Sequence, residues 1–341
     1  MMTSFAHDVL QPLVRGESMD RAQAAEALAE ILAGRVEGPL VASFLTALTI
    51  KGETVEEMTG FVDAMMGAAT QLRVPANAVD VVGTGGDQLH SVNVSTMAAL
   101  AVAGCGVPVA KHGNRAASSS VGSADVLEGL GVRLDVGPDV IEACLREAGM
   151  AFIFAPKYHH ALGYLTPIRR ALSFRTVFNV LGPLANPAGV RRGVIGVSSE
   201  HLLSPMSEVL LRRGVDSMIL VHGHDGLDEL SVGTTSTLVR VTPEGTTYET
   251  LDAGLELGVR HDVAELRGGD VSENVRVIHH FLDAEGGAVF DAVCANAALV
   301  LVASGESPSL TEGFERARES VTSGAARRVL ERMIDITRAR G

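Results

Sequence analysis

Three successive stretches in the first seventy or so residues place apolar side chains at helical spacing. The first stretch ends in glycine, a common helix stop, and Asp20 and Thr54 stand where helix N-caps would stand. No strand pattern precedes Val79. We therefore predict a small N-terminal α-helical lobe over residues 1–73. Its helices should cover residues 19–34, 39–50 and 54–69.

From Val79 onward, short runs rich in β-branched residues alternate with helical stretches. This alternation indicates an α/β fold with a mostly parallel central sheet, which we place in a large lobe over residues 74–341. Ligands bind such sheets beyond the carboxyl ends of the strands, so we expect the chemistry in the loops that follow them. The expected strands are 79–82, 107–110, 151–154, 194–197 and 217–221.

Composition narrows the class of protein. The chain has 341 residues, 46% hydrophobic and 20% charged, values that exclude an intrinsically disordered protein. Its 28 basic and 41 acidic side chains leave a net charge of −13, which argues against nucleic acid as a partner. Three cysteines, far apart and odd in number, fit neither a disulfide framework nor a zinc site. Because we find no signal peptide and no apolar run of membrane-spanning length, we expect a cytoplasmic protein with no membrane partner.

A glycine-rich loop follows the first predicted strand. Gly83, Gly85 and Gly86 lack the Cβ atoms that would keep an anion from the backbone N–H groups. Asp87 ends this loop, and the segment 93–96 then opens a helix, whose N-terminus favours phosphate. The spacing matches neither G-x-G-x-x-G nor the Walker A pattern, so it specifies no dinucleotide or ATP site. A tight turn is the alternative interpretation.

A second loop, residues 111–115, also suits an anion. Lys111 supplies a point charge, and Arg115 supplies a planar fork of donors. Ser118 and Ser119 follow with hydroxyl groups. The set suits a phosphate or pyrophosphate, whereas the alternative is a solvated basic turn. We favour the anion site because this loop ends a strand next to the first one.

Two adjacent carboxylates, Asp228 and Glu229, stand in a segment rich in histidine and glycine. Converging from a loop, they would suit Mg²⁺, which binds few protein oxygens and keeps water and substrate phosphates as ligands. One alternative is a solvated acidic pair. Another is a zinc site that includes His222 and His224 but lacks a clear third ligand.

A further basic segment holds Arg169 and Arg170, ten residues after His159 and His160. A guanidinium there can bind a carboxylate through two parallel hydrogen bonds. The alternative is a helix face with both arginines at the surface. We interpret the two histidines as structural or surface residues rather than metal ligands, because adjacent side chains point in different directions.

Taken together, these motifs resemble the anthranilate phosphoribosyltransferase family. The resemblance extends from about Phe5 to Ile336 and rests on an ordered set of motifs rather than on one. The matching segments are 83–87 (GTGGD), 93–96 (NVST), 111–115 (KHGNR), 122–128 (GSADVLE), 175–187 (RTVFNVLGPLANP), 226–229 (GLDE), 265–270 (ELRGGD) and 296–298 (NAA).

The resemblance implies a glycosyl transfer that belongs to tryptophan biosynthesis. The amine of anthranilate attacks C1 of phosphoribosyl pyrophosphate, pyrophosphate leaves, and N-(5-phosphoribosyl)anthranilate forms. The resemblance also implies Mg²⁺ as cofactor, a homodimer, and a fold shared with pyrimidine nucleoside phosphorylases. In that fold a segment near residues 160–190 returns to the helical lobe.

The same resemblance implies roles for individual residues. Lys111, Asn114 and Arg169 are the expected catalytic residues, with Arg169 suited to the carboxylate of anthranilate. Ser95, Asp228 and Glu229 match the Mg²⁺ ligands. The expected substrate contacts are Gly83, Gly86, Asp87, Ser91, Asn93, Val94, Ser95, Thr96, Lys111, His112, Gly113, Asn114, Arg115, Ser118, Ser119, Ser123, His159 and Arg169.

The chain departs from the family pattern near the expected acceptor site. The family usually has His-Pro where His159 and His160 stand, and Met or Tyr where Leu162 stands. Gln88 replaces a usual glycine, and His90 is an unusual occupant of its position. These departures leave open a phosphoribosyltransferase of the same fold for another aromatic acceptor. Two further alternatives share the fold: a pyrimidine nucleoside phosphorylase, and a nucleic-acid-binding relative without enzymatic activity.

Overall fold

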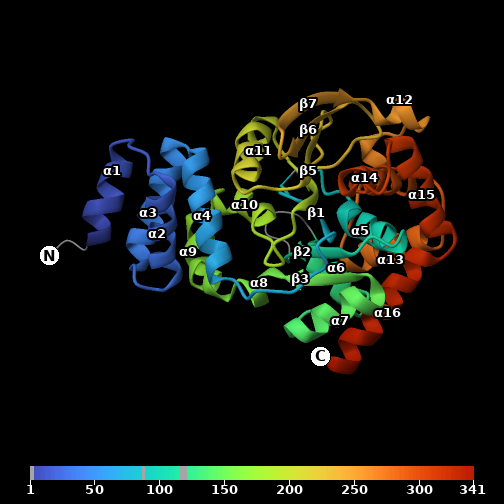
Figure 1. Cartoon of the computed structure of the whole chain (residues 1–341), viewed down its shortest axis with the longest axis horizontal. Coiled ribbons are helices and arrows are strands. Elements are labelled where there is room, and N and C mark those ends of the chain that lie inside the picture. Colours follow the sequence, from blue (N-terminus) through green and yellow to red (C-terminus); the bar gives the residue numbers. More distant parts are fainter. Residues whose placement is uncertain (1–3, 87–88, 116–120) are drawn as a thin grey trace.

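The computed structural model describes residues 4–86, 89–115 and 121–341. Figure 1 shows the N-terminal helices at one end of the molecule and the sheet, with its covering helices, in the other part. The N-terminal elements are a π-helical turn (Ala6–Leu10), α1 (Gln11–Val14), α2 (Arg21–Leu32), α3 (Gly38–Lys51) and α4 (Val55–Ala68).

The predicted caps explain where two of these helices begin. The Asp20 carboxylate accepts a hydrogen bond from the backbone N–H of Gln23 at 2.8 Å, and the Thr54 hydroxyl accepts one from the N–H of Glu57 at 3.2 Å. In both cases the side chain three residues on bonds back to the cap, which completes a capping box. The prediction of helices starting at these two residues is confirmed.

The second part is built on a seven-stranded sheet with the order β3-β2-β1-β4-β5-β6-β7. The first five strands in that order are parallel, and the last two pair antiparallel. The mostly parallel sheet agrees with the α/β prediction. The strands are β1 (Val79–Gly83), β2 (Val109–Gly113), β3 (Met150–Phe154), β4 (Arg192–Gly196), β5 (Ser217–Gly223), β6 (Ser236–Thr242) and β7 (Gly245–Leu251).

Two features of the sheet differ from the prediction. Strand β2 extends through Gly113, because Lys111 and His112 pair in register with Phe152 and Ile153 of β3. Strands β6 and β7 form a hairpin that the sequence interpretation missed. Much of β7 faces solvent, so its threonine-rich sequence shows no run of buried apolar residues.

Helices cover both faces of the sheet (Figure 1). On β4, Val194 packs into the cluster around α5 and α14, whereas its neighbour Ile195 packs into the cluster that contains α4 and α11. Among the described residues, no helix is long and apolar enough to cross a membrane. The remaining helices are α5 (Val94–Gly104), α6 (Ser123–Gly129), α7 (Pro138–Ala148), α8 (Ala155–Tyr158), α9 (Leu165–Leu172), α10 (Phe178–Leu181), α11 (Leu203–Arg212), α12 (Ala253–Leu257), α13 (Val271–Leu282), α14 (Ala288–Ser304), α15 (Leu310–Thr322) and α16 (Ala325–Arg340), with short 3₁₀ turns at His160–Tyr164, Gly182–Leu184, Glu200–Leu202 and Val263–Leu266.

The N-terminal helices contact the rest of the chain through a mid-chain segment. Helix α9 packs against α3, and the Tyr164 hydroxyl just before α9 donates a hydrogen bond to the backbone carbonyl of Val36 at 2.7 Å. Leu165, Phe178 and Leu181 belong to the same hydrophobic cluster as the N-terminal helices.

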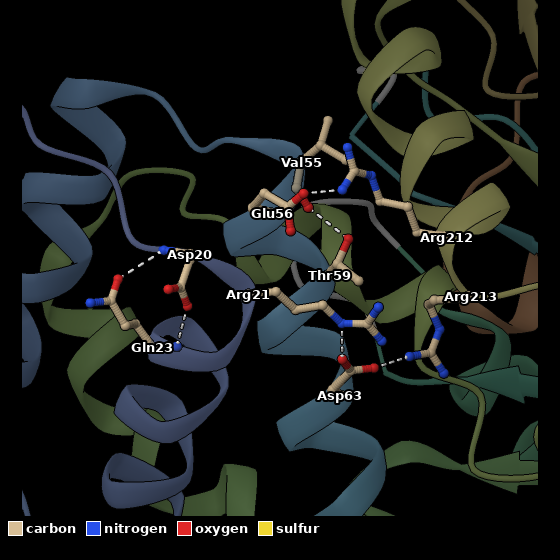
Figure 2. A network of polar contacts seen from close by, with 9 residues as sticks. All are labelled: Asp20, Arg21, Gln23, Val55, Glu56, Thr59, Asp63, Arg212 and Arg213. Atoms are coloured by element: carbon tan, nitrogen blue, oxygen red, sulfur yellow. Dashed lines mark hydrogen bonds and ion pairs between the residues drawn. The ribbon is translucent and has the colours of Figure 1, made fainter.

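Charged side chains join α4 to α11 on another side of this contact, as Figure 2 shows. Asp63 of α4 accepts a hydrogen bond from Arg21 of α2 at 2.6 Å and one from Arg213, just after α11, at 2.7 Å. Glu56, about two turns earlier on α4, forms an ion pair with Arg212. We refer to these five residues as the α4–α11 ion-pair network.

Candidate active site

A cavity of about 320 Å³ opens at the carboxyl ends of the parallel strands. Its size lies within the range of small-molecule sites. It is lined by the ends of β1 and β2, the start of α5, the loop after β5, and residues of α4, α9 and α10. Side chains from both parts of the molecule therefore face one space.

The glycine-rich loop forms one wall of this cavity. Gly85 and Gly86 have φ values of +65° and +83°, a conformation that favours glycine. The backbone N–H of Gly85 donates a hydrogen bond to Oδ2 of Asp228 at 2.7 Å. A Cβ atom on Gly83 would lie 2.4 Å from the same oxygen. The glycines therefore permit a close approach between this loop and the carboxylate.

Helix α5 begins at the cavity. Asn93 occupies its N-cap position, and Val94 and Ser95 line the cavity beside it. Oδ1 of Asn93 is buried and has no hydrogen-bond partner in the described part of the chain. Thr96 is fully buried and lies outside the lining, so the structure does not bring it to the cavity.

Lys111 lies in the middle of β2 with only 1% of its surface exposed. Its Nζ donates hydrogen bonds to the carbonyl of Val81 at 2.5 Å and to Oγ of Ser95 at 3.2 Å. Burial lowers the pKa of Lys111, and the nearby carboxylates oppose this shift. Nζ of Lys111 is thus held in a buried position beside Ser95, which also lines the cavity.

His112 and His159 face each other with ring centroids 5.5 Å apart. Burial, with a smaller contribution from His159, lowers the pKa of His112 to about 3, so its imidazole is neutral at physiological pH. Nε2 of His112 is buried without a partner among the described residues. Nε2 of His159 lies 2.7 Å from the carbonyl oxygen of Ala185 and donates a hydrogen bond to it. The structure thus places His159 both in the lining and in a buried hydrogen bond.

The two predicted anion-binding arginines differ in their surroundings. Arg115 is paired with Asp125 and Glu128 at 3.0 and 2.8 Å, so neighbouring carboxylates neutralise its charge. Arg169 lies over the ring of Phe178, 5.3 Å from its centroid. Within the described ranges, no carboxylate forms an ion pair with Arg169, and burial lowers its pKa. A half-buried guanidinium with no anionic partner is poised to bind an anion.

Asp228 and Glu229 also line the cavity, and Asp228 lies directly against the glycine-rich loop. No group of three or more His, Cys, Asp or Glu side chains arranged for a metal ion occurs in the described ranges. The nitrogens proposed for the alternative zinc site have other neighbours. Nδ1 of His222 lies 2.7 Å from the carbonyl of Val197, and both ring nitrogens of His224 lie within 2.8 Å of threonine hydroxyls.

The cavity gathers nearly all the residues predicted to form the site. Three of those residues, Asp87, Ser118 and Ser119, lie outside the described part of the chain, as does Gln88. Apart from Thr96, every other predicted residue lines the cavity: Gly83, Gly86, Ser91, Asn93, Val94, Ser95, Lys111, His112, Gly113, Asn114, Arg115, Ser123, His159, Arg169, Asp228 and Glu229.

Several lining residues were not predicted. Phe178 and Asn179 fall within the quoted segment 175–187, which was a usable signal. Met65 on α4 and Asn274 on α13 carried no signal in the sequence, because apolar helix positions and single asparagines are common throughout proteins. Oδ1 of Asn274 is buried and unpartnered among the described residues, so it presents a further acceptor beside the cavity.

Known proteins resemble the chain both in sequence and in structure. The sequence matches the helical bundle domain of a glycosyl transferase family over residues 7–69 and the a/b domain of that family over residues 75–327. An anthranilate phosphoribosyltransferase of Thermomicrobium roseum is 45% identical over 333 residues, which cover 95% of this chain and 95% of that protein.

Two solved structures share the fold over nearly the whole chain. Anthranilate phosphoribosyltransferase (TrpD) from Thermus thermophilus has a TM-score of 0.91 and 41% identity, covering 97% of this chain and 99% of that one. The Saccharomyces cerevisiae enzyme, solved in complex with PRPP and Mg, has a TM-score of 0.90 and 27% identity, covering 99% of both chains. On these likenesses the chain belongs to the anthranilate phosphoribosyltransferase family.

Proposed function

We propose that the chain transfers the 5-phosphoribosyl group from phosphoribosyl pyrophosphate to anthranilate, as a step of tryptophan biosynthesis. The nitrogen of anthranilate bonds to C1 of the ribose, the bond from C1 to the pyrophosphate oxygen breaks, and the nitrogen loses a proton. The observation that carries the proposal is the cavity itself. It combines a glycine-rich loop and a helix N-terminus with two carboxylates and an arginine that has no anionic partner among the described residues.

The donor binds, in this proposal, at the β1 and β2 side of the cavity. Backbone N–H groups of the glycine-rich loop and of the start of α5 suit the phosphates. Lys111 adds a buried hydrogen-bond donor, because its Nζ donates to the hydroxyl of Ser95 at the start of α5. As C1 becomes electron-poor and negative charge grows on the leaving pyrophosphate, preorganised donors stabilise that charge. Losing one such donor typically costs about 3 kcal/mol in the barrier.

Mg²⁺ fits the donor set that the structure presents. Asp228 and Glu229 supply two carboxylates on the cavity wall, and Ser95 supplies a hydroxyl. Mg²⁺ prefers oxygen ligands and is usually held by one or two carboxylates together with substrate phosphates. We propose that these three residues hold the ion, which when bound neutralises charge on the pyrophosphate.

Anthranilate binds on the side of the cavity that faces the N-terminal helices. Arg169 is proposed to hold its carboxylate, and Asn114 to lie beside the amine. Met65, Leu162 and Phe178 supply apolar surface for the aromatic ring. The imidazole rings of His112, which is neutral, and of His159, which is hydrogen-bonded to Ala185, add polar groups to the cavity wall. Catalysis in this site rests on positioning and on charge stabilisation, with no covalent nucleophile.

Loss of anthranilate fluorescence tests this function. Purified protein should consume anthranilate only when phosphoribosyl pyrophosphate and Mg²⁺ are both present. Replacing Arg169 with alanine removes charged hydrogen bonds worth about 1.5–3 kcal/mol, so the KM for anthranilate should rise about 10- to 100-fold. Arg170→Ala, on the next and more exposed residue of α9, is the matched control and should stay within about threefold of wild type.

Other outcomes identify the alternatives. Consumption of a substituted anthranilate in preference to anthranilate would indicate a phosphoribosyltransferase for another aromatic acceptor. Orthophosphate-dependent cleavage of a pyrimidine nucleoside would indicate a nucleoside phosphorylase. Failure to bind either substrate would refute the proposed function.

We further propose that the chain acts in the cytoplasm as a homodimer whose two lobes divide near residue 73. The boundary falls between the two matched domain models. Val14 on α1 and Ile50 on α3 are 72% and 81% exposed, which is unusual for large apolar side chains on neighbouring helices and suits a contact with a second copy. Light scattering should then give twice the 35.6 kDa of one chain.

A further inference from the structure

A buried asparagine lies in the strongly apolar helix α14. Asn296 is in the middle of α14, is 2% exposed, and is flanked by alanine and cysteine residues. An unpaired amide in such surroundings would cost several kcal/mol. Each polar atom of Asn296 is paired: Oδ1 accepts from the N–H of Leu230 at 2.8 Å, and Nδ2 donates to the carbonyls of Leu230 at 3.0 Å and Ala292 at 2.9 Å.

Two of these three bonds go to the backbone of one residue. Leu230 exchanges its N–H and its carbonyl with the amide, as it would with a neighbouring β-strand. It is the residue directly after Asp228 and Glu229, and its side chain is 1% exposed. The amide therefore fixes both the position and the orientation of the Leu230 backbone, directly after the two carboxylates.

The other end of the pair is fixed by glycines. A Cβ atom on Gly196 at the end of β4 would lie 1.6 Å from the carbonyl oxygen of Asp228, so backbone packs directly on backbone there. The N–H of Gly85 donates to the Asp228 side chain. In the chain, Glu229 lies between Asp228, which these contacts hold, and Leu230, which Asn296 holds.

We infer that Asn296 is a positioning residue for the Mg²⁺ ligands, acting through the backbone of Leu230 on Asp228 and Glu229. This inference rests on the proposed function. A purely structural role would lower stability and leave the affinity of the folded protein for metal unchanged. A positioning role weakens metal binding in molecules that are folded.

Two substitutions separate the roles. Asn296→Leu keeps a similar volume and removes all three hydrogen bonds. Asn296→Asp keeps an acceptor for the N–H of Leu230 and loses both donated bonds. Val300→Ala, one turn further along α14 and fully buried, is the matched control, because it opens a cavity in the same helix and leaves the three hydrogen bonds of Asn296 in place.

The direct measurement is a titration of Mn²⁺, followed by the electron paramagnetic resonance signal of the free ion, with phosphoribosyl pyrophosphate present. Partners that orient metal ligands typically contribute 10- to 100-fold in metal affinity. We expect a loss of that size for Asn296→Leu and a smaller one for Asn296→Asp, with Val300→Ala near wild type. The apparent KM for Mg²⁺ should rise in parallel, while the KM for anthranilate stays within about threefold.

The opposite pattern overturns the inference. If both Asn296 variants bind Mn²⁺ with the same affinity as Val300→Ala, at a similar loss of thermal stability, the role of Asn296 is only structural. If Asn296→Leu does not fold, Asn296→Asp gives the same comparison. Wild-type protein that binds no Mn²⁺ with phosphoribosyl pyrophosphate would also refute it. If wild type binds Mn²⁺ and the variants do not, but no anthranilate is consumed, the positioning role stands and the proposed acceptor fails.

Discussion

Replacing Gly196 with alanine should displace the loop that carries Asp228 and Glu229, by a distance that follows from the structure. Gly196 ends β4 and pairs in register with Gly83 and Val221. The added Cβ would lie 1.6 Å from the carbonyl oxygen and 2.7 Å from the carbonyl carbon of Asp228, whereas ordinary contact begins near 3.4 Å. Since the neighbour is backbone and cannot rotate away, the chain at Asp228 has to move by about 1.8 Å.

The displacement sets the expected size of the effect. Misplacing a catalytic group by about 1 Å can cost about 100-fold in rate, which corresponds to about 2.7 kcal/mol. Overpacking of this kind also destabilises a fold by about 1–3 kcal/mol. We therefore expect Gly196→Ala to lower kcat/KM for phosphoribosyl pyrophosphate at least 100-fold, and to lower the melting temperature by several degrees.

The assay is anthranilate fluorescence at varied phosphoribosyl pyrophosphate and Mg²⁺, with a melting curve of each variant. Gly286→Ala is the control, because a Cβ there meets nothing within 4 Å and the residue has no left-handed φ. Gly196→Ala with activity within about threefold of Gly286→Ala, in protein that is folded, would refute the reasoning. It would mean that the loop tolerates the shift, or that Asp228 does not contribute to donor binding.

Two further predictions concern stability. Burial raises the pKa of Asp80 to about 6, so the folded state keeps this proton to a higher pH than the unfolded chain does. The stabilisation is present below the ordinary pKa of about 4 and is lost as pH rises through 6. In urea unfolding, the free energy of unfolding of wild type relative to Asp80→Asn should therefore fall by about 1 kcal/mol from pH 5 to pH 7. A free-energy difference that stays constant with pH would contradict the shift. In the α4–α11 ion-pair network, Asp63→Asn removes two partly exposed ion pairs and should cost about 1 kcal/mol, most of it absent in 1 M NaCl. A loss that salt does not reduce would point to packing rather than charge.

The sequence predicted those parts of the molecule that depend on local chemistry. Asp20 and Thr54 mark helix starts because capping needs only neighbouring residues. The end of β2 was less visible, since Lys111 and His112 are polar and only their pairing with β3 makes them strand residues. The β6–β7 hairpin was missed because its outer strand has little buried surface.

The cavity shows the same division. Residues on the glycine-rich and basic loops were predicted because their types suit anions wherever the loops lie. Met65 and Asn274 were not predicted as parts of the site, because their relevance comes from the tertiary fold, which carries α4 and α13 to the loops. Asn296 falls within the quoted segment 296–298, but its hydrogen bonds to Leu230 needed the structure. The difference between Arg115 and Arg169 also needed the structure, because both are arginines and only one is neutralised by carboxylates.

The hydrogen bond from Gly85 to Asp228 makes two halves of the donor site interdependent. The glycine-rich loop and the carboxylate are the proposed contacts of pyrophosphate and of Mg²⁺, so ordering either one orders the other. Binding free energies are reciprocal: whatever factor the ion adds to the affinity for phosphoribosyl pyrophosphate, that substrate adds to the affinity for the ion. The protein should then bind Mg²⁺ and phosphoribosyl pyrophosphate cooperatively, and its rate should follow the concentration of their complex in the cell rather than the total of either component.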